Sequence, residues 1–213
     1  LLVIKSIFKL SLTKKNTIVI FQNLENIKVI DEFCNLNEFS KVLIEGSGVD
    51  LNLYHPKYNS ITPPVILFPS RLLKSKGILE FVEAAKQIPK ARFVIAGMLD
   101  DANPDCIDKS LLDEWVHNGF IEYWGYRYDM NETLNKSSIV VLPSYYGEGF
   151  PKVLMEAAAC GKPVVTTDHP GCRDAIISGE TGILIPKKNY KALIAALNFL
   201  LSSDNYFINM GRN

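Results

Sequence analysis

The sequence predicts an α/β protein built around a doubly wound parallel sheet of about six strands. From Val65 onward, short apolar runs alternate with stretches of helical periodicity, an order typical of a parallel sheet with helices on both faces. The runs that predict strands cover residues 65–68, 93–96, 120–124, 139–142, 163–166 and 183–185. The predicted helices cover residues 77–88, 107–116, 130–135, 151–160, 172–177 and 189–201.

Residues 1–45 predict a smaller unit ahead of this sheet. Residues 17–21 and 41–44 form short apolar runs typical of strands, and residues 24–34 between them have helical character. Residues 1–12 are apolar but carry Lys5 and Lys9, so they are too short and too charged to span a bilayer. We favour a helix that packs on a sheet here. The alternative is a basic amphipathic contact with a membrane surface.

Residues 46–64 predict a linker between the two parts. Gly46 and Gly48 permit a turn, and the stretch is polar and ends in two prolines. Residues 65–213 then form the larger domain. Because the chain starts at Leu1 rather than methionine, we expect it to be a fragment of a longer protein.

Composition narrows the class of protein. The chain has 213 residues, 47% of them hydrophobic, which is enough for one full core and part of another. The 23 Lys and Arg residues balance the 23 Asp and Glu residues, so charge does not favour a nucleic-acid partner. The four cysteines lack a C-x-x-C spacing and the three histidines form no metal pattern. These features indicate a reduced, cytoplasmic setting without a metal site.

The stretch from the predicted strand 139–142 to Gly161 carries the main chemical signal. Pro151 suits the first turn of a helix and Gly161 suits its end, which predicts a strand, a glycine-rich turn and a helix. The free N–H groups of such a helix favour an anion. Glu148 lies on the turn, and Glu156 lies in the helix among apolar residues, where ligand hydroxyls would satisfy its carboxylate. Taken singly, each has a plainer interpretation: Glu148 as an acid near a helix N-terminus, Glu156 as a partly exposed helix residue.

Two cations follow the first strand of the larger domain. Ligands of open α/β sheets bind at the carboxyl ends of strands, so Arg71 and Lys76 are expected on the ligand side. A guanidinium binds two phosphate oxygens at once and an ammonium adds a mobile point charge, so the pair suits an anion with phosphate oxygens. A solvated basic loop is the alternative and fits Lys74 better. The G-x-G-x-x-G fingerprint is absent, which argues against an NAD enzyme.

Two further turns end predicted strands. Gly125 and Tyr126 follow the strand 120–124, where Tyr126 or Arg127 could stack on a base. Aromatic packing at a strand end explains them equally well. Gly171 opens the predicted helix 172–177, where its lack of a side chain allows a ligand close to the backbone.

The stretch EGFPKVLMEAAACGKPVVTTD, with Glu148 and Glu156 eight positions apart, resembles the paired-glutamate signature of retaining glycosyltransferases of family 4. These enzymes have the GT-B architecture. The likeness extends from about Gln22 to Arg212 and is strongest to bacterial enzymes that build lipid-linked surface polysaccharides. It implies that residues 65–213 are the Rossmann-like, nucleotide-sugar-binding half of a GT-B fold. Residues 1–45 would be the end of the N-terminal, acceptor-side domain. Many family members have glycine where this chain has Ser70.

The resemblance also implies an activity: transfer of a hexose or N-acetylhexosamine, with retention of configuration, to a glycan or a polyprenyl-diphosphate-linked sugar. A UDP-sugar is the favoured donor and a GDP-sugar the second, with no metal or other cofactor. Arg71 and Lys76 would hold the diphosphate, Glu148 the sugar hydroxyls and Glu156 the ribose.

The donor would further contact Gly149, Phe150 and Pro151. Gly125 and Tyr126 would lie beside the base, and Gly171 near the donor.

Several alternatives remain open at this point. The same architecture serves phosphorylases and epimerases, and a nucleotide-sugar-binding fragment without activity is a third reading. Most of the acceptor-side domain is absent, so we expect the chain alone to be inactive. The expected location is the cytoplasm, with peripheral contact at the cytoplasmic face of the inner membrane as the narrower alternative.

Overall fold

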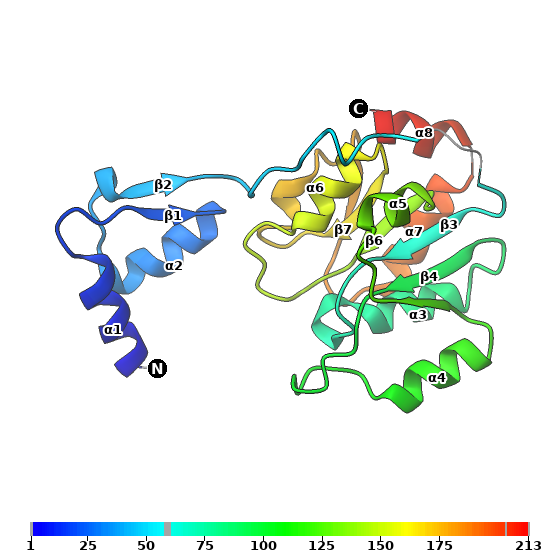
Figure 1. Cartoon of the computed structure of the whole chain (residues 1–213), viewed down its shortest axis with the longest axis horizontal. Coiled ribbons are helices and arrows are strands. Elements are labelled where there is room, and N and C mark those ends of the chain that lie inside the picture. Colours follow the sequence, from blue (N-terminus) through cyan, green and yellow to red (C-terminus); the bar gives the residue numbers. More distant parts are fainter. Residues whose placement is uncertain (1, 58–60, 203, 213) are drawn as a thin grey trace.

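The computed structural model describes residues 2–57, 61–202 and 204–212, and in residues 204–207 it describes the backbone only. Its main feature is a parallel sheet of six strands in the order β5-β4-β3-β6-β7-β8 (Figure 1). The strands are β3 (Val65–Phe68), β4 (Arg92–Ala96), β5 (Glu122–Gly125), β6 (Ile139–Leu142), β7 (Val164–Thr167) and β8 (Gly182–Ile185). The predicted fold class is therefore confirmed. The strand order reverses between β3 and β6, which is where open α/β sheets bind ligands.

The helices cover both faces of this sheet. They are α3 (Ile78–Ala85), α4 (Lys109–His117), α5 (Met130–Asn135), α6 (Lys152–Ala159), α7 (Tyr190–Leu200) and α8 (Asp204–Arg212). Alternate residues of β3 point to opposite faces, as the pleat of a strand requires. Ile66 and Phe68 pack with side chains of α3, α4 and α7. Val65 and Leu67 pack with side chains of α5 and α6. Both faces of β3 are buried, which explains its continuous apolar run.

One predicted helix is wrong. Residues 172–177 contain only a 3-10 turn, Arg173–Ala175, and the chain is already extended at Ile176. Gly171 precedes the turn with φ +82°, and its N–H donates to the carboxylate of Asp174 at 3.1 Å. This local hydrogen bond offers the backbone an alternative to a helix. The connection from β7 to β8 therefore lacks an α-helix. Helix α8, by contrast, was not predicted.

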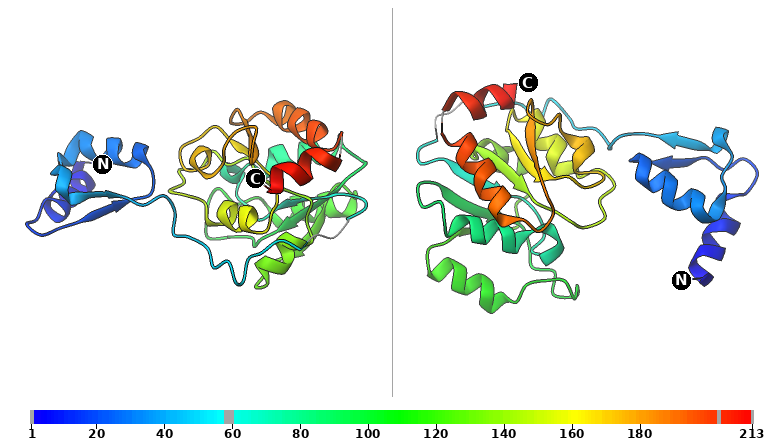
Figure 2. Two further views of the ribbon diagram at one scale, coloured as in Figure 1. Left: turned by 90° about the horizontal axis from the view of Figure 1, so that it is seen from above. Right: turned by 180° about the vertical axis from the view of Figure 1, so that it is seen from behind.

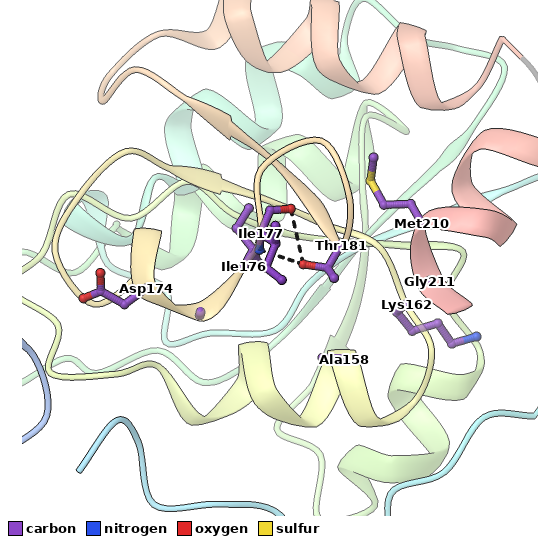
Figure 3. A pocket seen from close by; sticks show the side chains of 9 residues that line it. Ala158, Lys162, Asp174, Ile176, Ile177, Thr181, Met210 and Gly211 are labelled. Carbon is purple, nitrogen blue, oxygen red and sulfur yellow. Dashed lines mark hydrogen bonds between the residues drawn. The ribbon is translucent and has the colours of Figure 1, made fainter. Parts of the chain in front are cut away.

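A pocket of about 290 Å³ lies where that connection passes α6 and α8 (Figure 3). Its lining is mostly apolar, with Lys162, Asp174 and Thr181 as polar members. The pocket is lined by Ala158 near the C-terminal end of α6, whereas the glycine-rich turn precedes the N-terminal end. It is therefore separate from the expected ligand edge.

A smaller unit precedes the sheet domain. It contains α1 (Leu2–Leu12), β1 (Val19–Phe21), α2 (Leu24–Cys34), the 3-10 turn η1 (Glu38–Ser40) and β2 (Lys41–Leu43). Strands β1 and β2 pair in parallel, with α2 as the crossover. An extended segment joins the unit to the sheet domain, and the unit stands to one side of it (Figures 1 and 2). Asn23 caps the start of α2, and Asn35 ends it in the left-handed conformation.

Helix α1 packs against α2 rather than against a sheet as expected, with Lys5 Nζ 5.1 Å from the ring centroid of Phe33. None of its residues is buried. Its exposed large apolar side chains are Leu2, Val3, Ile4, Ile7, Phe8 and Leu10. Within the described ranges, no helix is both long and apolar enough to cross a membrane. An apolar surface of this size is typical of a contact with another molecule.

We expect the exposed apolar side of α1 to bind a second copy of the chain, and the double substitution of Val3→Lys and Leu10→Lys to reduce this self-association. These residues lie seven positions apart on one side of α1 and are both strongly exposed, so charge there should repel a second copy without disturbing the fold. Sedimentation velocity over a range of concentrations measures the effect. Phe39→Lys, at an exposed aromatic outside α1, serves as the control. Unchanged concentration dependence in the double variant would contradict this expectation.

Candidate functional site

Ser75, which follows β3, connects the loops at the carboxyl edge of the sheet through hydrogen bonds. Its N–H donates to the carboxylate of Asp105 at 2.8 Å, and its hydroxyl donates to the same oxygen. Its carbonyl accepts from the N–H groups of Tyr145 at 2.8 Å and Tyr146 at 3.1 Å. The hydrogen bonds from Ser75 lower the pKa of the Asp105 carboxyl. Three loops, after β3, β4 and β6, are thereby held in one arrangement.

Lys76 and Glu148 meet at the centre of these loops. The Lys76 ammonium donates to Glu148 Oε1, and each side chain is 12% exposed. The hydroxyl of Ser144 donates to the same oxygen at 3.0 Å. Tyr146 covers the ammonium, with its ring centroid 4.9 Å from Lys76 Nζ. Two residues predicted from distant parts of the sequence are thus brought together in a largely desolvated ion pair.

Arg71 lies on the same edge but has a different partner. Its Nη1 donates to the carboxylate of Asp100, on the loop after β4, at 2.8 Å. The Arg71 side chain is 44% exposed. Sequence reasoning missed Asp100, although an Asp-Asp pair shortly after a buried strand is a recognisable signal of a polar edge. The guanidinium is accessible, and an incoming anion would share it with Asp100 or replace that residue.

Glu156 lies in α6 and is 7% exposed, as its apolar neighbours predicted. Its carboxylate is 3.6 Å from Lys152 Nζ. The phenol of Tyr54 also interacts with Glu156, and burial together with this carboxylate raises the pKa of Tyr54 to about 12. Tyr54 belongs to the predicted linker, and no sequence pattern connects it with Glu156. A protein hydroxyl therefore lies where ligand hydroxyls were expected.

The glycine-rich turn ends at Pro151, which caps α6 with φ −65°. Gly149 and Phe150 lie between Glu148 and this cap. Gly171, from the loop after β7, packs directly on the turn: a Cβ atom there would lie 2.6 Å from the Gly149 oxygen and 2.8 Å from the Glu148 oxygen. The residue therefore has to be glycine for two reasons, its positive φ and this contact.

Gly125 and Tyr126 lie on the far side of the edge. Gly125 closes β5, the outermost strand, with φ +68°, and its carbonyl accepts from the N–H of Gly97 at 2.9 Å. Tyr126 is exposed and stacks edge-to-face on Tyr128, with ring centroids 4.8 Å apart. Arg127 makes two hydrogen bonds to Asp129, at 2.9 and 2.6 Å. Of the two predicted stacking residues, Tyr126 is the accessible one.

Three or more His, Cys, Asp or Glu side chains do not gather into a metal-binding group anywhere in the described part of the chain. The charged groups at the edge include the ion pairs of Lys76, Arg71 and Glu156. This arrangement can bind an anion through its cations and hydroxyl groups through its carboxylates.

The sequence model of a family described as glycosyl transferases group 1 matches residues 53–213. The chain belongs to this family. Two curated relatives carry names from polysaccharide and lipid-linked glycan synthesis. One is N,N'-diacetylbacillosaminyl-diphospho-undecaprenol alpha-1,3-N-acetylgalactosaminyltransferase of Campylobacter jejuni, 34% identical over 99% of this chain and 58% of that protein. The other is the capsular polysaccharide biosynthesis glycosyltransferase CapM of Staphylococcus aureus, 27% identical over 84% of this chain and 51% of that protein.

Solved structures of group 1 and related GT-B glycosyltransferases share the fold. Sucrose-phosphate synthase of Thermosynechococcus elongatus superposes with a TM-score of 0.84 at 24% identity, over 98% of this chain and 54% of that one. HepE of Anabaena, in complex with UDP and glucose, gives a TM-score of 0.82 at 20% identity, over 98% of this chain and 61% of that one. The predicted relation to the GT-B architecture is confirmed. This chain spans about half the length of the curated relatives it matches.

Gly171→Ala is expected to destabilise the sheet domain more than Gly179→Ala does. Both glycines have a left-handed φ near +85°, but a Cβ at Gly179 meets no atom within 4 Å, whereas one at Gly171 meets two backbone oxygens. The backbone conformation alone costs about 1–2 kcal/mol. The contact at Gly171 should add about 1–3 kcal/mol. Urea denaturation measures both, and equal losses would show that the turn tolerates displacement.

Proposed function

We propose that this chain is the donor-binding half of a glycosyltransferase that takes a hexose or N-acetylhexosamine from a nucleotide sugar. The observation that carries the proposal is the Lys76–Glu148 pair at the strand-order switch, beside the N-terminus of α6, in a chain of the group 1 family. A UDP-sugar is the favoured donor. The proposed acceptor is a glycan or a polyprenyl-diphosphate-linked sugar, in line with the name of the Campylobacter jejuni relative.

The diphosphate is the part of the donor that this site suits best. As the anomeric carbon–oxygen bond breaks, negative charge grows on the leaving diphosphate. Lys76, Arg71 and the backbone N–H groups at the start of α6 would stabilise that charge in place. The acceptor oxygen forms the new bond from the same face of the sugar, which retains configuration, and the acceptor proton passes to the leaving diphosphate. Because fixed cations serve this purpose, we propose that no metal is required.

The two glutamates would bind hydroxyl groups. Glu148 neutralises Lys76, so a donor would replace one ion pair with two sets of contacts: phosphate oxygens on Lys76 and sugar hydroxyls on Glu148. Glu156 would accept from the ribose hydroxyls and share them with Tyr54. Tyr126 is placed to stack on the base, with Gly125 beside it. Gly149, Phe150, Pro151 and Gly171 shape the surface under the sugar and phosphate.

The chain alone is proposed to bind the donor without transferring the sugar, since it spans about half of its relatives. A phosphorylase or epimerase on the same fold is less well supported, because no observation here favours either. We further propose a cytoplasmic setting. Contact with the inner membrane through α1 would use its exposed apolar side chains together with Lys5 and Lys9.

Isothermal titration calorimetry with UDP tests the donor proposal. We expect saturable binding that is equal with and without EDTA, because the site uses Lys76 and Arg71 in place of a metal. UDP-sugars and GDP-sugars in parallel titrations identify the preferred base and sugar. A folded sample that shows no binding to any of them would refute the proposal, and binding abolished by EDTA would refute its metal-independent part.

The two glutamates are expected to respond oppositely to neutralisation. Glu156→Gln should weaken UDP binding about tenfold, because the ribose hydroxyls would then donate to a neutral amide oxygen instead of a charged carboxylate. Glu148→Gln should leave UDP binding equal or tighter, since it frees Lys76 from its carboxylate. Glu83→Gln, on the exposed side of α3, is the control. Weaker UDP binding in Glu148→Gln would show that Glu148 contacts the nucleotide rather than the sugar.

A further inference from the structure

Asn23 connects the smaller unit to the glycine-rich turn. It is 2% exposed, and both ends of its amide are in use. Its Oδ1 accepts from the N–H of Asn26 at 2.8 Å and so caps α2. Its Nδ2 donates to the carbonyl of Gly149 at 2.7 Å and to that of Glu148 at 3.2 Å. One buried side chain thus joins two parts of the protein that lie more than a hundred residues apart in sequence.

Helix capping explains the amide oxygen of Asn23 but not its NH2 group. A cap needs an oxygen, which Ser, Thr or Asp would supply equally well. The second half, an NH2 group, can donate two hydrogen bonds, and the two adjacent carbonyls of the turn accept them. Asparagine combines both functions in one short, rigid side chain.

The contact fixes more than two carbonyl groups. A trans peptide is planar, so its N–H points opposite to its C=O. When Asn23 holds the carbonyls of Glu148 and Gly149, the N–H groups of Gly149 and Phe150 must point away from the smaller unit. Neither N–H donates a hydrogen bond within the described residues. Two adjacent N–H groups without a protein acceptor, next to the Lys76–Glu148 pair, suit an anion.

Two neighbouring residues further restrict the conformation of the turn. Gly171 packs on the same two carbonyl oxygens. Gln22, beside Asn23, lies against Gly149 so closely that a Cβ there would be 2.1 Å from its Oε1. The turn is therefore held between the loop after β7 and the smaller unit.

We propose that Asn23 is a positioning residue for the donor site: it orients two peptides of the turn so that the N–H groups of Gly149 and Phe150 face the donor's diphosphate. The inference rests on the proposed function for the identity of the ligand. The smaller unit would thus contribute to donor binding by orienting the turn through Asn23.

Asn23→Ser is the decisive variant, because serine keeps an oxygen for the cap and removes the amide donor. Asn37→Ser is the matched control. Asn37 lies in the same unit and caps η1 by accepting from Phe39 N at 3.0 Å, and no hydrogen bond from its NH2 group is described. Two-dimensional 15N–1H NMR spectra report the amides of Gly149 and Phe150. Calorimetry with UDP reports the site.

We expect the Gly149 and Phe150 cross-peaks to shift or broaden in Asn23→Ser and to stay in place in Asn37→Ser. UDP affinity should fall about tenfold in Asn23→Ser only. Asn23→Asp, which keeps the cap and the shape but sets a carboxylate against two carbonyl oxygens, should show a larger loss. If the cross-peaks of α2 show that Asn23→Ser unfolds the smaller unit, the Asn23→Asp variant tests the proposal in its place.

Unmoved Gly149 and Phe150 cross-peaks in Asn23→Ser and Asn23→Asp would overturn the proposal. Shifted cross-peaks with unchanged UDP affinity would overturn the assignment of these N–H groups to the donor. If the unsubstituted chain binds no nucleotide, the proposed function fails and the ligand assigned here fails with it. The cross-peaks would then still decide whether Asn23 sets the turn.

Discussion

The Ser75 carbonyl accepts hydrogen bonds from two successive peptides of the glycine-rich stretch, and the rest of the site depends on this link. It is made by backbone atoms, so it follows from the fold: β3 and β6 are neighbours in the sheet although a long stretch of chain separates them. The loops that leave these two strands must therefore meet. Lys76 comes directly after Ser75, and Glu148 follows the linked tyrosines closely. The fold thus places the ammonium and the carboxylate within contact of one another.

The charges at the site are balanced by ion pairs within the protein. Lys76 is paired with Glu148, Arg71 with Asp100 and Lys152 with Glu156. A buried charge without a partner is costly, so Lys76 and Glu148 each need a counterion until a ligand replaces it. The Lys76–Glu148 pair is mostly shielded from water, whereas Arg71 is largely exposed. An incoming diphosphate can therefore meet Arg71 first at little cost. The exchange at Lys76 is favourable only for a ligand that also satisfies Glu148, which favours a nucleotide sugar over a simple phosphate.

Local sequence pattern predicted the parts that local physics decides. The strands at 65–68 and 139–142 and the helix between Pro151 and Gly161 follow from apolar runs, a first-turn proline and a terminal glycine. The prediction of a helix at 172–177 was wrong because a local hydrogen bond between Gly171 and Asp174 stabilises a turn that apolar spacing does not reveal.

The partners of the site residues could not be predicted from the sequence, for a different reason. Arg71 with Asp100, Glu156 with Tyr54 and Asn23 with Gly149 each join loops or units that are remote in sequence. No periodicity encodes such a meeting. Lys76 and Glu148 were expected on the same edge because each follows a strand of one parallel sheet, but the ion pair between them was not predicted.

The smaller unit and the start of the linker form a joint with the turn and the helix that carry Glu148 and Glu156. Asn23 reaches the turn before α6, and Gly46, at the start of the linker, packs so closely on Met155 of α6 that a Cβ would lie 2.6 Å from its sulfur. The apolar side chains of α1 are exposed rather than used in this joint. Hydrogen bonds to backbone carbonyls can exchange with water at a small net cost, about 1 kcal/mol each, so such a joint can open and re-form without exposing a core. Because both contacts bear on the turn and the helix of Glu148 and Glu156, any displacement of the smaller unit acts directly on the groups assigned to the donor.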